Sequence, residues 1–518
     1  MLHTIIKENC YYDSIFLMKA SKKMKQVDGV NRIVLVMGTE VNKSVLQDAG
    51  MLTPKAQSAA PGSLIISLDT ETQEQVQDAL NCLEELNSAH EVTEDREEHF
   101  ASLEQVLRKK KDRNLAVISL PGEYAAVEAK SALKAGLNVF IFSDNVPLEE
   151  EIMLKQYAKS RGLFVMGPGC GTAVINGISL GIMSRIKKGN IGVVGASGSG
   201  LQEICVLADR MGYGVSQAIG TGGRDLSREV GGITMLQGID YLSRDPETRV
   251  LVLVSKPPHP DTCRKIYDRL REIDKPAVIY FLGGDREEIE ASGSFSAASL
   301  EEAAVLAVRL CSGKTIERSD YIGQVIHELK DKAALEAEGK TPVQRYVRGL
   351  YCGGTHSEEA ALMLKNCLPQ LYSNVHFAGL LPMEDPGTSR EHCLIDMGDE
   401  WFTVGRPHPV IDPSILSDRL IKEGTDPETS VLLFDLLLGY GIHKDPVGTI
   451  EDALKTIEEK NKEAGRHLTM VCALCGTDAD PQGFEDQKRR LEDKGVIVFA
   501  SNARAALFAG LAVKGKMG

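Results

Sequence analysis

Hydrophobic residues occur in a regular arrangement over most of the chain. From Leu115 onward, short apolar runs such as "LAVISL", "NVFIFS", "NIGVVG" and "VLVLVS" are separated by segments with helical periodicity. The runs do not alternate between apolar and polar residues, which is typical of parallel strands that helices cover on both faces. This pattern predicts an α/β fold with doubly wound sheets.

The first part of the chain has a less regular pattern. The apolar runs 33–37 and 64–68 alternate with helical patterns such as "QEQVQDALNCLEELN". Residues 90–112 are rich in charge and poor in β-branched side chains, which favours a solvated helical linker. We therefore expect a small α+β domain, with its linker, over residues 1–112.

Two later stretches repeat the same order of elements. "DPETRVLVLV" at 245–254 returns as "DPETSVLLFD" at 426–435, and each copy runs into an apolar strand pattern. A Gly-rich loop and a helical pattern precede each copy, with "GASGSG" in the first and "CGGTHS" in the second. A turn sequence that recurs by chance is the alternative, but the matching order favours an internal repeat of two related α/β domains.

These patterns predict four domains, since 518 residues are too many for one hydrophobic core. After the N-terminal domain, we expect a Rossmann-like domain over 113–188. Two flavodoxin-like domains, related by the repeat, are expected over 189–330 and 340–518.

Composition narrows the class of protein. The chain is 43% hydrophobic and 25% charged, as soluble globular enzymes are, and its net charge is −14. Its lysines are scattered, which argues against a nucleic-acid partner. A small anionic substrate and phosphate remain compatible with this charge, because helix N-termini bind anions locally.

The 11 cysteines and the N-terminus indicate a compartment. Most cysteines lie in apolar contexts, and Cys472 and Cys475 of "CALC" favour two core thiols over a redox or metal pair. The first residues lack the pattern of a leader, and no run approaches the roughly 20 apolar residues of a membrane span. We expect a cytoplasmic protein without a protein-ligated metal.

Candidate anion sites follow the apolar runs, where doubly wound sheets bind ligands. In "GASGSG" (195–200), serine hydroxyls adjoin the N–H groups of a helix start, which suits an anion, although a capped helix needs only the serine. In "GTGGRD" (220–225), Arg224 is either a clamp for carboxylate or phosphate or a surface residue. The predicted anion-binding residues are Ser197, Gly198, Ser199, Gly200, Gly220, Gly222, Arg224, Gly353, Gly354, Thr355, Gly439 and Gly441.

Three residues of the second repeat are candidates for catalysis. His356 of "CGGTHS" lies at a helix start, which disfavours its charged form and predicts a neutral imidazole, with helix capping by Thr355 or Ser357 as the alternative. Asp435 interrupts an apolar strand, and a buried carboxylate needs a partner. The glycines of "GYG" after it permit a tight loop that carries His443.

Polar residues in other loops are candidate substrate contacts. Asp478 and Asp480 of "GTDADPQG" could bind Mg²⁺ through water or cap the next helix. Arg406 and His408 lie in the Pro-stiffened "GRPHPVIDP", which suits either a positioned contact or a rigid turn. Asn502 of "SNARAALFAG" completes this set.

These motifs resemble a known family. "LAVISLPGEYAAVEAKSALKAGLNVFIFSDNVP", "FVMGPGCGTAVING", "GASGSG" and "GTGGRD" resemble the α-subunit of succinyl-CoA synthetase, and "CLIDMGDE", "DPETSVLLFDLLLGYGI" and "SNARAALFAG" its β-subunit ligase domain. With "GGTH", "RPHPVIDP" and "GTDADPQG", nearly the whole chain resembles the FdrA family, often labelled acyl-CoA synthetase.

The resemblance implies a CoA-contacting site, but the chain also lacks several features of succinyl-CoA synthetase. Gly122, Ser143, Asn145 and Pro168 match later parts of the synthetase's CoA-contacting region, although the front of that domain is missing here. An ATP-grasp domain has no counterpart, and the segment corresponding to the phosphohistidine loop, "ASGSFSAAS" (291–299), has no histidine. The paired helix N-termini that hold phosphate would follow residues 198–200 and lie near 439–442.

Three functions are compatible with this resemblance. The family implies a component of an oxamate carbamoyltransferase in allantoin nitrogen catabolism, which converts oxalurate and phosphate to oxamate and carbamoyl phosphate. Alternatives are an acyl-CoA synthetase with a separate ATP-grasp partner, and a non-catalytic homologue that senses a ligand. CoA and Mg²⁺ are possible cofactors, and partner subunits and a homo-oligomer are expected.

Overall fold

The computed structural model describes residues 1–8, 12, 14–93, 100, 102–316, 320–365, 367–375, 379–403 and 407–514. They form two compact units. The N-terminal unit comprises Met1–Gln105 with Phe402–Pro407, and the main unit comprises Val106–Trp401 with His408–Gly518.

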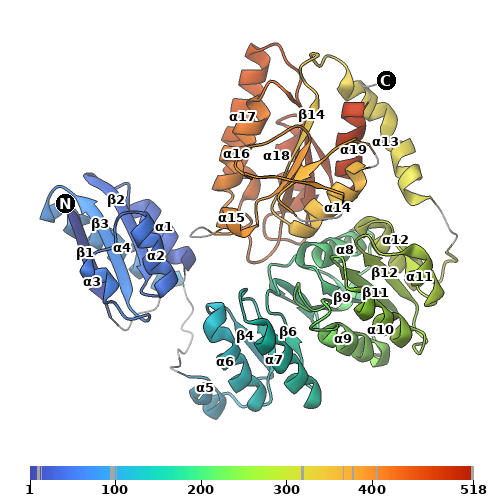
Figure 1. Cartoon of the computed structure of the whole chain (residues 1–518), viewed down its shortest axis with the longest axis horizontal. Helices are drawn as coiled ribbons and strands as arrows, with labels where there is room; N and C mark the ends of the chain where they lie inside the picture. The colour runs from blue at the N-terminus through green and yellow to red at the C-terminus, as the bar shows by residue number, and fades with distance from the viewer. Residues whose placement is uncertain are drawn as a thin grey trace. The chain divides into compact units, whose positions relative to one another are not determined.

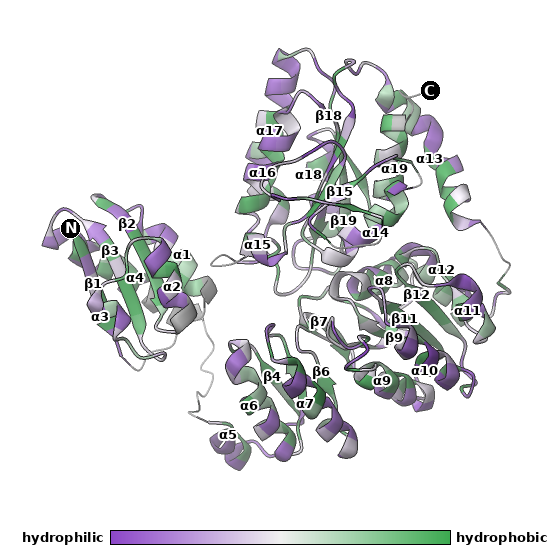
Figure 2. Ribbon diagram, in the orientation of Figure 1, coloured by the Kyte–Doolittle hydropathy of each residue, from purple (hydrophilic) through white to green (hydrophobic). Residues whose placement is uncertain are grey.

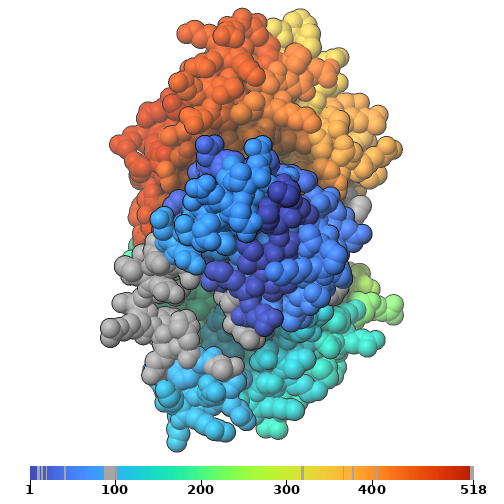
Figure 3. Space-filling view, turned by 90° about the vertical axis from the view of Figure 1, so that its left-hand side faces the viewer, coloured from blue at the N-terminus to red at the C-terminus, as the bar shows by residue number. Residues whose placement is uncertain are grey.

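The N-terminal unit is built on an antiparallel sheet in which β3 (Leu64–Thr70) lies between β1 (Leu2–Lys7) and β2 (Val30–Met37). Its helices are α1 (Ser14–Met24), α2 (Glu40–Asp48), α3 (Pro54–Gln57) and α4 (Gln73–Thr93) (Figure 1). Figure 3 shows the surface of this unit in dark to mid blue. The expected small α+β domain is confirmed.

Side chains of β3 alternate between two apolar clusters. Ile66 and its neighbours two residues away pack with α1 and α4, whereas Ile65 packs on the opposite face with α2 and α3. This period of two is the normal geometry of a strand. The helix α4 extends to Thr93, into the predicted linker; residues 94–99 of that linker lie outside the described residues.

Three parallel strands open the main unit. They are β4 (Leu115–Ile118), β5 (Asn138–Ile141) and β6 (Val165–Met166), paired in the order β4-β5-β6. The helix α5 (Leu103–Lys109) precedes them, and α6 (Gly122–Lys134) and α7 (Leu148–Ser160) connect them.

Two seven-stranded sheets form the rest of the unit. The first has the order β13-β12-β11-β9-β10-β7-β8 and the second β16-β15-β17-β14-β18-β19-β20. The strands of the first are β7 (Thr172–Ile175), β8 (Ile178–Gly181), β9 (Lys188–Ala196), β10 (Val215–Gly220), β11 (Val250–Ser255), β12 (Ala277–Phe281) and β13 (Phe295–Ser296). Those of the second are β14 (Tyr346–Tyr351), β15 (Tyr372–Ser373), β16 (Leu381–Pro382), β17 (Cys393–Asp396), β18 (Thr429–Leu437), β19 (Thr469–Cys475) and β20 (Val496–Phe499).

The two sheets share one topology. In each, the first long strand (β9 or β14) lies between the second (β10 or β17) and the third (β11 or β18), and two more strands extend the sheet beyond the third. This is the flavodoxin-like order. We call the parts of the chain built on the first and second of these sheets the first and second half. The short strands β15 and β16 are an insertion in the second half, and β7 and β8 extend the sheet of the first half. The internal repeat expected from the sequence therefore exists as repeated topology.

The repeated "DPET" takes the same conformation in both halves. Asp245 and Asp426 each end a helix, α9 (Ile233–Arg244) or α16 (Ser414–Thr425). In each copy the aspartate Oδ1 accepts the N–H of the following glutamate, at 3.1 and 2.9 Å. The threonine N–H then bonds back to the aspartate carbonyl, at 3.2 and 3.1 Å. The sequence is repeated because it stops a helix and turns the chain into the third strand.

The strand pairing does not follow the predicted boundary at residue 188 between the Rossmann-like domain and the first flavodoxin-like domain. The hairpin β7–β8 falls in the segment assigned above to the Rossmann-like domain, yet β7 pairs antiparallel with β10 at Val174 and Ala218. Its backbone groups thus complete the first seven-stranded sheet. A short-range sequence pattern cannot reveal this partner, which lies more than 40 residues away.

Helices cover both faces of each seven-stranded sheet, and the strands between them are the most apolar part of the unit (Figure 2). Helices of the first half are α8 (Gly198–Arg210), α9, α10 (Pro260–Leu270), α11 (Arg286–Ala291) and α12 (Leu300–Cys311). Those that follow are α13 (Tyr321–Ala337), α14 (Gly354–Lys365), α15 (Glu400–Thr403), α16, α17 (Pro446–Glu463), α18 (Phe484–Glu492) and α19 (Asn502–Lys514). No described helix is long and apolar enough to cross a membrane.

Candidate functional site

The first helix of each half begins at the same place in the main unit. Ser197 caps α8: its Oγ accepts the N–H of Gly200 at 3.1 Å and donates to Thr355 Oγ1, in the first turn of α14, at 2.7 Å. A Cβ on Gly353 would lie 2.9 Å from Ser199 Cβ, so glycine is needed for this approach. Two helix N-termini, one from each repeat, therefore meet at the carboxyl ends of their strands (Figure 1).

A reciprocal pair of hydrogen bonds joins the halves behind this junction. Glu203 in α8 and Glu359 in α14 occupy equivalent positions in the two halves. Glu203 is six residues after Ser197, and Glu359 is six residues after Gly353; Ser197 and Gly353 each directly precede their helix. Glu359 Oε1 accepts the N–H of Leu300 at 2.7 Å, and Glu203 Oε1 accepts the N–H of Asn502 at 2.9 Å. Each carboxylate thus binds the first N–H of the last helix of the other half.

His356 breaks this symmetry. Its Nε2 lies 2.9 Å from Glu203 Oε2 and its Nδ1 lies 3.0 Å from Asp435 Oδ2, with all three side chains buried. Burial lowers the pKa of His356, but the hydrogen bonds and charges of Asp435 and Glu203 outweigh it and raise that pKa to about 10. This raised pKa contradicts the expected neutral imidazole, because the two carboxylates outweigh burial and favour the charged ring.

Asp435 has the partners that its burial in a strand requires. Its carboxylate accepts the N–H groups of Cys352 and Gly353, at 2.6 and 3.2 Å, besides contacting His356. Because His356 and Asp435 are both 0% exposed, neither can contact a substrate in this structure. Their geometry instead fixes the loop in which α14 begins.

His443 belongs to another loop. Its Nδ1 accepts the N–H of Asp445 at 3.1 Å, and Asp445 caps α17. The preceding glycines do not open a helix. Gly439 and Gly441 have φ of +131° and +70°, and Tyr440 pairs with Met183. The helix start that faces α8 is that of α14, so the pairing expected near 439–442 is wrong.

Arg224 is engaged within the protein. Its Nε donates to Glu151 Oε2 at 3.0 Å and a terminal nitrogen donates to the carbonyl of Val146 at 2.6 Å, which ties the 221–232 loop to α7. These bonds contradict a guanidinium held ready for an anion. Gly222 has φ of +86°, and a Cβ there would lie 2.3 Å from the Pro168 carbonyl. Gly220 also lacks room for a side chain, since an added Cβ would lie 2.4 Å from Cys170 Sγ.

The two aspartates of the "TDAD" loop have different roles. Asp480 is buried and accepts the N–H groups of Arg185 and Thr477, at 2.6 and 2.8 Å, which joins the two halves. Asp478 is exposed, 3.5 Å from Arg210. Neither caps α18, whose N-cap is Gly483. Among the described residues, no group of three or more His, Cys, Asp or Glu side chains could hold a metal ion.

Asn502 and His408 have different surroundings. Asn502 Nδ2 donates to the carbonyl of His356 and to Glu359 Oε2, so this side chain is part of the buried cluster. His408 is partly buried, and its Nδ1 accepts the N–H of Val410 at 3.4 Å. Burial lowers the pKa of His408, which keeps it neutral. Arg406 lies outside the described residues.

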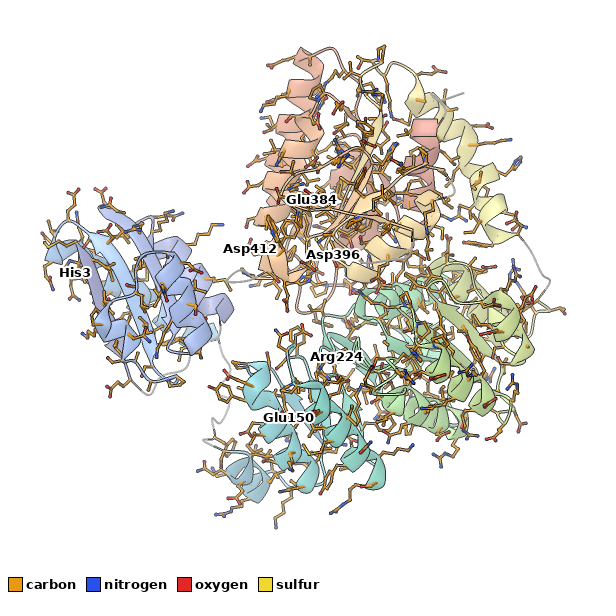
Figure 4. All side chains as sticks on the ribbon, in the orientation of Figure 1. His3, Glu150, Arg224, Glu384, Asp396 and Asp412 are labelled. Carbon is orange, nitrogen blue, oxygen red and sulfur yellow. The ribbon has the colours of Figure 1, made fainter. Side chains whose placement is uncertain are left out.

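Two polar residues beside the start of α14, Lys256 and Asp396, were not predicted from the sequence. Lys256 follows β11, and its Nζ donates across the halves to Glu358 Oε1 at 2.8 Å. Asp396, labelled in Figure 4, ends β17. A Cβ on Gly354 would lie 3.2 Å from Lys256 Nζ and 2.8 Å from Asp396 Oδ2. Both residues end apolar runs, which is the signal that would have identified them.

The residues matched to a CoA-contacting region lie at one edge of the three-stranded sheet. Gly122 begins α6 after β4, Ser143 and Asn145 follow β5, and Pro168 follows β6. Gly122 packs directly on Asn145, because a Cβ there would lie 2.5 Å from the Asn145 carbonyl carbon. The buried Ser143 Oγ has no hydrogen-bond partner.

Three protein-family models match the chain. A model described as AllF, heavy metal-associated domain matches residues 1–104, a CoA binding domain matches 186–282, and a CoA-ligase model matches 350–512. The CoA binding match covers the first flavodoxin-like half, so Gly122, Ser143, Asn145 and Pro168 lie outside it.

Similar proteins match either the whole chain or part of it. The uncharacterized protein YahF of Escherichia coli is 40% identical over 506 residues, covering 98% of this chain and 97% of YahF. Subunits alpha of succinate–CoA ligase are similar over part of the chain. The subunit alpha of Aquifex aeolicus is 25% identical, and the match covers 45% of this chain and 79% of that subunit. The subunit alpha 2 of Archaeoglobus fulgidus is 29% identical, and the match covers 36% of this chain and 63% of that subunit.

Among solved structures, acetyl-coenzyme A synthetase 1 of Ca. Korarchaeum cryptofilum is 17% identical. It covers 79% of this chain and 84% of its own, with a TM-score of 0.30. The full-length similarity to YahF and the three domain matches confirm the resemblance drawn from the motifs. The chain belongs to the FdrA/AllF-like family of acyl-CoA synthetase-like proteins.

Proposed function

We propose that the chain catalyses acyl transfer between phosphate and coenzyme A, as the nucleotide-independent part of an acyl-CoA ligase. An acyl phosphate and the CoA thiol would give an acyl-CoA thioester and phosphate. The observation that carries this proposal is the meeting of α8 and α14 at Ser197 and Thr355. Gly198 is exposed and Gly354 half-buried, so an anion can reach the N–H groups of both first turns.

The relatives support ligase chemistry of this kind. Both halves of the junction fall in segments similar to CoA binding and CoA-ligase models, and named relatives are alpha subunits of succinate–CoA ligases. A separate nucleotide-binding partner subunit would then make the acyl phosphate.

The CoA-contacting candidates fit part of that ligand. The N–H groups at the start of α6 offer donors to a phosphate or an amide. Gly122, Ser143, Asn145 and Pro168 would hold CoA, which supplies the thiol when bound.

A thioester assay tests the proposal. The full chain would be mixed with CoA and acetyl, propionyl or succinyl phosphate, and the acyl-CoA would be measured by mass spectrometry. Gly198→Asp should lower the rate by about 10-fold or more, because a carboxylate at the α8 start repels the anion. Gly223→Asp is the matched control in an open loop. Absence of thioester from every acyl phosphate would contradict the function.

Carbamoyl transfer to phosphate is the second candidate. One observation favours it: the N-terminal unit matches the AllF domain model. The loop after β12, Leu282–Asp285, has no histidine, and neither has 291–299, so a phosphorylated histidine has no counterpart there. Oxalurate and phosphate would give oxamate and carbamoyl phosphate, which coupling to carbamate kinase and ADP detects. ATP formation that depends on oxalurate would establish this reaction in place of thioester formation.

A further inference from the structure

We propose that Asp396 is the general base that accepts the proton of the attacking thiol, an assignment that rests on the acyl transfer proposed above. Asp396 ends β17, next to β14 in the sheet, where Tyr351 pairs with it. Its Oδ2 approaches Gly354, the first residue of α14, and Gly353 beside it contacts Ser199 at the α8 start. The carboxylate thus lies beside the start of α14, whose loop packs against the start of α8.

The carboxylate is fixed in position by its own strand end. Asp396 Oδ1 accepts the N–H of Gly398 at 2.8 Å. The backbone of Asp396 makes two bonds to the Asn374 amide, both 2.9 Å long. Oδ2 remains for a substrate, and the residue is only partly buried. His356 and Asp435 have no such access.

Charged groups around Asp396 suit it to a proton acceptor. Burial raises the pKa of Asp396 to about 7, because desolvation outweighs the Gly398 N–H and the Lys256 ammonium, which lower it. A base is most effective when its pKa lies near the working pH. The charged or titratable groups facing it from the packed elements are Lys256 after β11, Glu358 in α14, Asp435 in β18, Asp399 before α15 and His408.

The proton transfer balances within the reaction. As sulfur bonds to the acyl carbon, Asp396 takes the thiol proton. The bond between that carbon and the phosphate oxygen breaks, and phosphate leaves with the bonding pair. The protonated Asp396 then returns the proton to the departing phosphate, so the carboxylate is regenerated. Lys256 is a positioning residue: it holds Glu358 and keeps the Asp396 pKa from rising further.

Kinetics of isosteric variants test this role. Asp396→Asn should lower kcat by about 100-fold or more and remove the acidic limb near pH 7 from the pH–rate profile. Lys256→Met should shift that limb to higher pH. Glu384→Gln, an exposed carboxylate of the same half labelled in Figure 4, should leave rate and profile unchanged.

Infrared difference spectra of the wild type and Asp396→Asn give a second reading that needs no turnover. One protonated carboxyl band should disappear from the wild-type spectrum as pH rises through about 7 and be missing from the variant, in which the band of Glu359 remains. Wild-type activity in Asp396→Asn, or no such band, would overturn the assignment alone. A wild-type chain without transfer activity would overturn the proposed function, and with it the thiol as the proton donor.

Discussion

His356 is the cation that allows two carboxylates to be buried between the halves. Replacing it by leucine keeps an apolar side chain in the space but leaves Glu203 and Asp435 without their positive partner. Such an uncompensated charge typically costs about 3–5 kcal/mol. We expect His356→Leu to lower the free energy of unfolding of the main unit by about that amount in urea titrations. Ser357→Ala, which removes a buried hydroxyl without a partner on the same turn, should change it by about 0.5 kcal/mol or less.

The same cluster predicts a pH dependence of stability. The pKa of His356 is raised from 6.5 to about 10, and that of Glu359 is raised by burial from 4.5 to about 8. A group whose pKa is raised by folding stabilises the fold below its unfolded pKa and loses that contribution as pH rises through the folded value. Stability should therefore fall between about pH 5 and pH 10.

The variant His356→Leu separates the two groups. It should remove the part of the fall that belongs to His356 between about pH 6.5 and pH 10, while Glu359, whose pKa His356 lowers, still titrates in the variant. Denaturant midpoints of wild type and variant, measured from pH 6 to pH 10, check this. Parallel curves for the two proteins would show that His356 is not the titrating group.

The role of a single residue could be predicted from the sequence only where its neighbours along the chain determine that role. A carboxylate inside an apolar strand demanded partners, so Asp435 could be identified from its neighbours alone. Its bond to Cys352 arises when β14 and β18 pair within the second sheet, whereas the reciprocal Glu203 and Glu359 bonds arise only when the halves associate. Each glutamate looks like an ordinary helical residue, and nothing within one helix indicates that it caps another.

At the scale of elements, a buried ion cluster attaches α7 to the loop after β10. Lys155 is 0% exposed, and its Nζ lies 2.7 Å from Asp225 Oδ1 and 2.9 Å from Glu151 Oε1. Asp225 also accepts the N–H groups of Thr234 and Met235 at the start of α9. The cluster thus sets the position of the three-stranded sheet against the first half.

Lys155→Met tests that attachment. Methionine keeps the length of the side chain but leaves the buried Asp225 without a cation and Glu151 with Arg224 alone, so stability should fall by about 3–5 kcal/mol. Lys159→Met changes an exposed residue of the same helix and should have little effect. Calorimetric unfolding of both variants provides the comparison; equal transition temperatures would mean that the cluster adds nothing to the attachment.

Element types were predictable where the pattern was regular. Continuous apolar runs predicted the parallel strands, and the repeated "DPET" predicted that the two halves have the same order of elements. The hairpin β7–β8 and the α8–α14 junction were not predictable in the same way, since both depend on partners distant in sequence. Glycines show the limit well: Gly439 was expected to open a helix but instead gives the backbone room to approach Met183.

For the whole molecule, the separate core of the N-terminal unit is the feature with the clearest thermodynamic consequence. Ile66 is 0% exposed and packs among apolar residues of β3, α1 and α4. Leu253 is equally buried in the core of the first seven-stranded sheet. Because each cluster is confined to one unit, a cavity in one core should destabilise that unit and leave the other unchanged.

Hydrogen exchange in the full chain can read the two units separately. Ile66→Ala should lower the free energy of opening of β2 and β3 amides by about 3 kcal/mol, a typical cost for a buried isoleucine, and leave β9 and β11 amides unaffected. Leu253→Ala should give the converse pattern, and serves as the matched control. If either variant lowered protection equally in both units, they would unfold as one cooperative block, and the N-terminal unit would not be an independent domain.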